Sequence, residues 1–291
     1  MIKQYKVGRL SYRVNFVEGG KNDEELIPSS KPFETDLTDE PLIFELTVDD
    51  AYRPAEAGEE IGQFDCGGNN HGVYQRKDGG YEIRITNYMG QQCCLLCTTS
   101  DFSKGWVALN GGYSMRNFGL NNSLMIMYAF SAAHLNTMLF HASVIREKGY
   151  GYLFLGVSGT GKSTHTGNWL KYIPGTDLMN DDNPVVRFID GQAIVFGSPW
   201  SGKTPCYRSV HYPLGGIVLL SQAPYNKIER LNGIYAYAAL MESISGKRWD
   251  ERIADGLHQT ENALASSIPV WHLECLPDEE AAILCNETIT P

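Results

Sequence analysis

The sequence predicts an α/β protein in which a β-rich N-terminal region precedes a C-terminal α/β domain. Three observations support this. Short alternating apolar runs separated by glycine turns fill residues 1–118, whereas helical and strand patterns alternate over residues 119–291. Within the second region an apolar strand leads directly into a glycine-rich loop and then into a helical repeat. A chain of 291 residues is long enough for two such domains.

The N-terminal region consists of strands joined by turns. We expect strands at 11–17, 42–48, 72–76, 81–86, 93–98 and 106–109. The turn Asp78-Gly79-Gly80 lies between two alternating runs and predicts a hairpin. No catalytic constellation occurs in this region, so we interpret it as a docking or substrate-selecting layer, or simply as a β cap.

The C-terminal region mixes helices and strands. We expect helices at 123–136, 234–245 and 249–264, and strands at 140–145, 185–189, 193–196, 215–221 and 270–276. Asp190-Gly191 forms a hairpin turn between two of these strands, and Asp278 is positioned to cap a last short helix.

Composition excludes several classes of function. The net charge of −10 and the lack of a basic cluster argue against a nucleic-acid partner. The most apolar stretch, 124–140, is shorter than the ~20 residues of a membrane span and contains polar side chains, so we interpret it as a buried helix. No signal peptide is recognisable at the N-terminus, and the seven scattered cysteines indicate reduced thiols in the cytoplasm. Cys94 and Cys97 have the spacing of half a zinc site, but without a second pair we place them in a strand.

The most informative motif is Gly156-Val157-Ser158-Gly159-Thr160-Gly161-Lys162-Ser163, which fits the phosphate-loop pattern. Its glycines let backbone N–H groups turn inward around phosphate oxygens, its lysine reaches the outer phosphates, and its serine offers a hydroxyl to Mg²⁺. The helix that follows adds its positive dipole end at the same point. The motif therefore predicts binding of a nucleotide's phosphates together with Mg²⁺. The residues expected to bind the nucleotide are Gly156, Ser158, Gly159, Thr160, Gly161, Lys162, Ser163 and Thr164.

A phosphate loop needs a carboxylate for its metal ion, and this chain offers two in succession, Asp181 and Asp182. On an extended segment neighbouring side chains point to opposite faces, so one carboxylate can hold the metal while the other faces the phosphate acceptor. This division suits a kinase, in which one residue takes the acceptor's proton. The alternative is an acidic turn, because the surrounding Asn-Asp-Asp-Asn-Pro is rich in turn-forming residues.

The loop and the double aspartate together resemble the superfamily that joins HPr kinase/phosphorylase to ATP-dependent phosphoenolpyruvate carboxykinase. The strand around His141 resembles the histidine-containing strand that precedes the loop in HPr kinases, and the resemblance covers roughly residues 121–290. It implies a mixed sheet, a homo-oligomer, and ATP and Mg²⁺ as cofactors. It also implies Asp181 as the catalytic base, and Ser163 and Asp182 as the metal ligands. The chain departs from the pattern at His165, where HPr kinases usually have a glutamate.

Three further side chains have both a catalytic and a structural interpretation. His141 lies on an apolar strand, where a histidine is either buried and hydrogen-bonded or catalytic. Lys203 ends the glycine-flanked turn 197–203 and could neutralise the transferring phosphoryl group or be a solvated surface lysine. Arg208 could join it, and Trp200 could either stack on a substrate or pack inside the protein.

The leading hypothesis is an ATP-dependent, HPr-kinase-like kinase that phosphorylates a hydroxyl of a small molecule or a carrier protein, with Lys162, Asp181, His141 and Lys203 as candidate catalytic residues. One alternative is a phosphoenolpyruvate carboxykinase-type activity. The other is a nucleotide-sensing or peptide-binding module without transfer, in which the β-rich half would be the interaction surface.

Overall fold

Two mixed β-sheets, each with parallel and antiparallel neighbours, organise the chain. The computed structural model describes residues 1–65, 70–202, 204–246 and 248–291, and the chain divides into unit 1, residues 1–132, and unit 2, residues 133–291. The boundary expected from the sequence, between residues 118 and 119, lies inside a helix of unit 1. Within the described residues, none of the helices combines the length and the apolar character needed to cross a bilayer.

The sheet of unit 1 has the strand order β3-β1-β2-β4-β9-β8-β7-β6-β5. Its elements are β1 (Ile2–Val7), β2 (Leu10–Phe16), η1 (Glu24–Leu26), η2 (Pro28–Phe33), β3 (Glu34–Thr35), β4 (Leu42–Val48), β5 (Glu59–Asp65), β6 (Asn70–Gln75), β7 (Tyr81–Thr86), β8 (Gln92–Thr98), β9 (Lys104–Leu109) and α1 (Tyr113–Ala132). The strands expected at 42–48 and 81–86 are confirmed with their bounds.

The helix α1 packs on β4, β8 and β9 of this sheet. The approach is close at Gly119, where a Cβ would lie 3.0 Å from the Cβ of Cys94 and 3.2 Å from its sulfur. Burial raises the pKa of the Cys94 thiol to about 12 and that of Cys97 to about 11, so both thiols are protonated at neutral pH. Both residues lie in β8, within the strand expected there.

The helix expected at 123–136 begins ten residues earlier, at Tyr113, and ends four residues earlier, at Ala132. Polar residues of its first turns bind the 3₁₀ segment η1. The side chains of Tyr113 and Asn117 donate to the carbonyls of Glu25 and Leu26. These contacts join residues distant in sequence and leave no periodic signal.

Unit 2 contains the glycine-rich loop. Its elements are η3 (Ala133–Leu135), β10 (Thr137–Leu139), β11 (Ala142–Glu147), β12 (Tyr150–Leu155), α2 (Lys162–Tyr172), β13 (Asp177–Asp182), β14 (Val185–Ile189), β15 (Gln192–Phe196), β16 (His211–Gln222), β17 (Lys227–Leu231), α3 (Ile234–Met241), α4 (Glu251–Ser267), β18 (Val270–Cys275) and α5 (Glu279–Ile289). The main strand order is β10-β14-β15-β16-β12-β11-β13. The long strand β16 also pairs in parallel with β18, which in turn pairs with β17.

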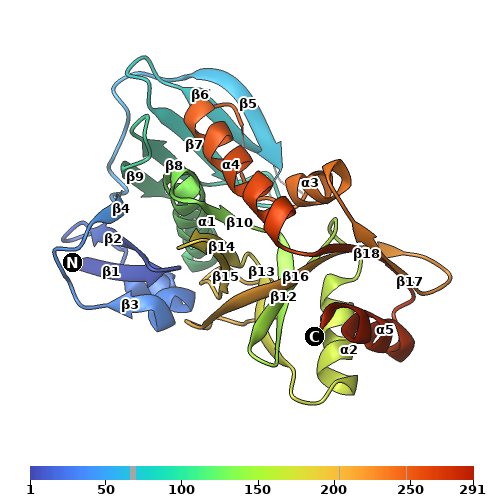
Figure 1. The fold of residues 1–291 in the computed structure, drawn as a ribbon. Helices are drawn as coiled ribbons and strands as arrows, with labels where there is room; N and C mark the ends of the chain where they lie inside the picture. Colours follow the sequence, from blue (N-terminus) through green and yellow to red (C-terminus); the bar gives the residue numbers. More distant parts are fainter. Residues whose placement is uncertain (66–69, 203, 247) are drawn as a thin grey trace. The chain divides into compact units, whose positions relative to one another are not determined.

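The helices α2 and α5 contact each other, and Figure 1 shows them side by side. They cover a core in which Phe154 of β12 and Trp169 of α2 meet edge-on, with ring centroids 5.4 Å apart. Asp278 caps α5 as expected, by accepting from the N–H of Ala281. The packing of α2 on this core fixes the end of β12 relative to the start of α2, and thereby positions the loop between them.

Candidate active site

The glycine-rich loop connects the buried strand β12 to α2 in unit 2. Gly156, Gly159 and Gly161 have φ angles of 149°, 84° and 113°, a backbone region that residues with a Cβ rarely adopt. Gly161 is also the N-cap of α2, where no side chain caps the helix. Within the described part of the chain no side-chain cap occupies this helix terminus, which suits an anion-binding site.

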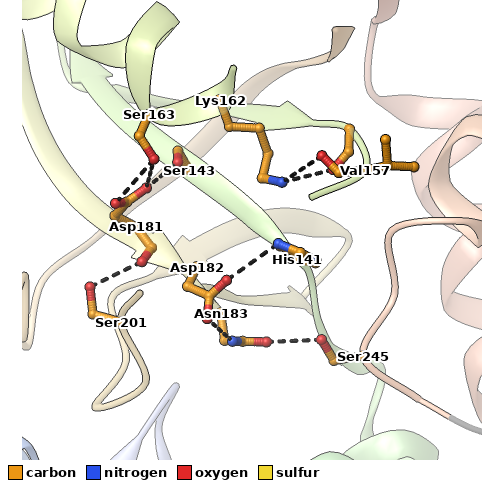
Figure 2. Close-up of polar contacts among 11 residues, drawn as sticks. His141, Ser143, Val157, Lys162, Ser163, Asp181, Asp182, Asn183, Ser201 and Ser245 are labelled. Carbon is orange, nitrogen blue, oxygen red and sulfur yellow. Dashed lines mark hydrogen bonds and ion pairs between the residues drawn. The ribbon is translucent and has the colours of Figure 1, made fainter. Parts of the chain in front are cut away.

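The amine of Lys162 lies over this loop. Its Nζ donates to the carbonyl of Gly156 at 2.8 Å and to that of Val157 at 3.4 Å, and the side chain is buried (Figure 2). Burial lowers the pKa of Lys162, against the opposing effect of Asp182 and Asp181. Among the described residues, the two carbonyls occupy two of the three donors of this ammonium group. Of the other loop residues expected to bind phosphate, Ser158, Gly159, Ser163 and Thr164 are exposed and Thr160 is half-buried.

Gln222, at the end of β16, is a further loop contact that the sequence analysis missed. Its Nε2 donates to the carbonyls of Gly159 and Thr160, both at 3.3 Å. These two hydrogen bonds tie the loop to the end of β16. No local sequence pattern identifies Gln222, because its place follows from the parallel pairing of β16 with β12.

The two aspartates end the strand β13, which pairs antiparallel with β11 and has one register shift, between the partners of Val144 and Ile145. The alternative interpretation of this segment as an acidic turn is therefore wrong. The segment pairs with β11 instead: Ser143 lies opposite Asp181 and Ala142 opposite Asp182. The two carboxylates contact different groups, as the alternation of an extended segment predicts.

Asp181 is buried and faces the start of α2. Its Oδ1 accepts from the hydroxyl of Ser143 and lies 3.2 Å from the hydroxyl oxygen of Ser163, whose distance to Oδ2 is 3.4 Å (Figure 2). Neighbouring oxygen ligands of an octahedral Mg²⁺ lie about 3 Å apart, because each metal–oxygen bond is 2.0–2.1 Å long. Ser163 and Asp181 therefore fit a shared Mg²⁺.

Asp182 faces a different group, the imidazole of His141. Its Oδ1 lies 3.4 Å from Nε2 of His141, and its Oδ2 accepts from the side-chain amide of Asn183 at 2.9 Å. Burial raises the pKa of Asp182, while burial and the nearby charge of Lys162 lower that of His141. A carboxylate with a raised pKa beside an uncharged imidazole is suited to accepting a proton.

The backbone of Asp182 has a φ angle of 147°, in a region that non-glycine residues avoid. Such a conformation costs ~1–3 kcal/mol and persists only where the surroundings impose it. Here the turn 197–202 imposes it: the N–H of Gly202 and the hydroxyl of Ser201 both donate to the carbonyl of Asp181. The turn thus fixes the point at which the two carboxylates diverge.

The turn accounts for two residues with open interpretations. Trp200 is buried, so it packs inside the protein. Arg208 donates to Asp177 at 2.6 Å and to the carbonyl of Leu178 at 2.5 Å, at the opposite end of β13 from the aspartates. It therefore anchors the segment after the turn. The candidate Lys203 lies outside the described residues.

Comparisons with known proteins give little further guidance. No family model matches the sequence, and no curated protein matches it. Among solved structures, the chain is similar to the Hpr(Ser) kinase/phosphatase from Coxiella burnetii, with 11% sequence identity and a TM-score of 0.30 over 51% of this chain and 91% of that chain. The likeness is distant and concerns half of the chain, so the activity has to be argued from the site itself.

Proposed function

We propose that this chain is an ATP-dependent phosphotransferase that moves the γ-phosphoryl group of ATP to a hydroxyl of a small molecule or a carrier protein. The observation that carries the proposal is the divergence of two adjacent carboxylates, one toward the loop serine and the other toward a histidine. A nucleotide sensor needs the first of these carboxylates for its metal ion but has no use for the second.

The loop amides and Lys162 would bind the phosphates of ATP, with the amine leaving the carbonyls of Gly156 and Val157 for phosphate oxygens. Ser163 and Asp181 would hold Mg²⁺, which neutralises the phosphate charge when it is bound. This geometry favours exchanging the roles that the family resemblance implied, since the resemblance gave the metal to Asp182 and the base to Asp181. The reason is the partner of each side chain: the hydroxyl of Ser163 lies beside Asp181.

Asp182 would then take the proton of the acceptor hydroxyl. The acceptor oxygen forms a bond to the γ-phosphorus, the bond from that phosphorus to the β–γ bridging oxygen breaks, and ADP leaves. His141 lies against Oδ1 of Asp182 and would disperse the charge of the carboxylate.

The experiment is to incubate the chain with radiolabelled ATP, Mg²⁺ and fractionated cell extract, and to identify what becomes labelled. Saturable Mg²⁺-dependent ATP binding together with a labelled phosphate ester of the acceptor is the expected result. Tight ATP binding without turnover would favour the hypothesis of a non-catalytic module. Oxaloacetate-dependent formation of phosphoenolpyruvate would favour the hypothesis of a carboxykinase-type activity. Either result would overturn the proposal.

A further inference from the structure

Asn183, the residue after the two aspartates, forms a hydrogen-bonded chain with Ser245 that ends on the proposed base. Its Nδ2 donates to Oδ2 of Asp182 at 2.9 Å, and its Oδ1 accepts from the hydroxyl of Ser245 at 2.9 Å (Figure 2). An ionised carboxylate only accepts hydrogen bonds, so this amide orientation is the one that Asp182 favours. We propose that Asn183 and Ser245 are positioning residues that orient the Asp182 carboxylate toward His141; the inference rests on the function proposed above.

The backbone of Asn183 is held on both sides, which makes its buried side chain a rigid support. Its N–H donates to the carbonyl of Trp200 at 3.2 Å, and its own carbonyl accepts from the hydroxyl of Ser198 at 2.6 Å. Ser198 is fully buried. The amide nitrogen of Asn183 therefore reaches Asp182 from a fixed point.

Ser245 is held in a similar way. Its N–H donates to the carbonyl of Leu139 at 2.9 Å, and two residues earlier the carbonyl of Ser243 accepts from the N–H of His141 at 2.6 Å. The segment after α3 thus binds both the bend at His141, which lies between β10 and β11 and not on the strand expected from the sequence, and the amide that supports Asp182. One hydrogen-bonded network sets the positions of the imidazole and of the carboxylate that faces it.

With its two oxygens on different partners, the carboxylate of Asp182 has a single defined rotation. Oδ2 is bound by Asn183, and Oδ1 is left directed at His141. Without the amide, the carboxylate can rotate toward the cation of Lys162, whose charge already acts on it. Reorientation on this scale would misplace the base relative to the acceptor hydroxyl without changing the loop that binds ATP.

The closing experiment compares Asn183→Ala, Ser245→Val, Ser245→Thr and the Asn183→Ala/Ser245→Val double variant, with Thr260→Ala as the control. Thr260 is a buried hydroxyl of α4 that donates to the carbonyl of Gly256, so its loss tests a general effect of destabilisation. We expect Asn183→Ala to lower kcat for transfer, or for ATP hydrolysis with water as acceptor, about 10- to 100-fold with KM for ATP within about twofold. Ser245→Val should lower kcat about two- to tenfold, and Ser245→Thr, which keeps the hydroxyl, should restore it.

The double variant should be no worse than Asn183→Ala alone, because Ser245 acts through Asn183. The inference would be overturned if the effects of the two single variants on kcat multiply in the double variant. It would also be overturned if kcat falls as far in the Thr260→Ala control as in Asn183→Ala. A second readout needs no activity: the ¹⁵N chemical shift of His141 Nε2 should move in Asn183→Ala and stay unchanged in Thr260→Ala. An unchanged shift overturns the positioning role, whereas a wild-type chain that neither transfers nor hydrolyses overturns the proposed function alone.

Discussion

The hydroxyl oxygen of Ser163 lies 3.2 Å from Oδ1 of Asp181, which links the first turn of α2 to the end of β13. Ser143 of β11 binds the same carboxylate from the neighbouring strand. Three separate segments of unit 2 therefore meet at one buried carboxylate. This relationship favours Asp181 over Asp182 as the proposed metal ligand.

Replacing the loop lysine by an uncharged side chain should weaken ATP binding. Lys162→Met removes a charge-assisted contact worth ~1.5–3 kcal/mol, so we expect the Kd for ATP to rise about 10- to 100-fold by calorimetry. Lys171→Met is the control, because Lys171 lies exposed in the last turn of the same helix, where its Nζ donates to the hydroxyl of Tyr172 at 2.7 Å. Equal affinity in both variants would exclude Lys162 from the phosphate site.

The conformation of Gly161 should be needed for binding. A Cβ at this position meets nothing within 4 Å, so Gly161→Ala tests the backbone φ of 113° alone. Strain of about 1–3 kcal/mol should turn the loop amides away and weaken ATP binding at least about tenfold.

Gly167→Ala is its matched control, because Gly167 is an exposed residue inside α2 with equal space for a Cβ. It should raise the free energy of unfolding by about 0.5–1 kcal/mol and leave ATP affinity unchanged. A loop that tolerates Gly161→Ala as well as the helix tolerates Gly167→Ala would not be a phosphate cradle.

Protonation of His165 should destabilise the fold in acid. Burial lowers the pKa of His165 from 6.5 to about 4, and its Nε2 accepts from the indole N–H of Trp169 at 3.1 Å. Between pH 6.5 and about 4 the unfolded chain binds more protons than the folded chain, so the free energy of unfolding falls as the pH falls. The resulting loss in the free energy of unfolding reaches about 3 kcal/mol near the lower end of this pH range.

His165→Gln keeps an acceptor for Trp169 but does not titrate. Denaturant unfolding of wild type and variant in metal-free buffer should therefore show a smaller acid loss in the variant. Parallel stability curves from pH 7 to pH 4 would contradict the assignment of His165 as a neutral, structural residue.

The strand–loop–helix order around the glycines could be predicted from sequence because it is local: an apolar run, a glycine pattern and a helical repeat adjoin one another. The extended form of β13 was harder to predict. Asp181, Asp182 and Asn183 have turn propensity, and the pairing with β11 that overrides it is a contact between distant residues. The side chains that contact each aspartate could not be predicted from the sequence for the same reason, since Ser143 is one small residue on an apolar strand.

The most direct test of the account compares Asp181→Asn with Asp182→Asn in ATP binding and in transfer. We predict that Asp182→Asn keeps Mg²⁺-dependent ATP binding and loses transfer by about 10²- to 10⁴-fold, the range of general base catalysis. Asp181→Asn should lose the Mg²⁺ dependence of binding itself. Transfer at the wild-type rate in Asp182→Asn, or loss of Mg²⁺-dependent binding in that variant alone, would contradict the assignment.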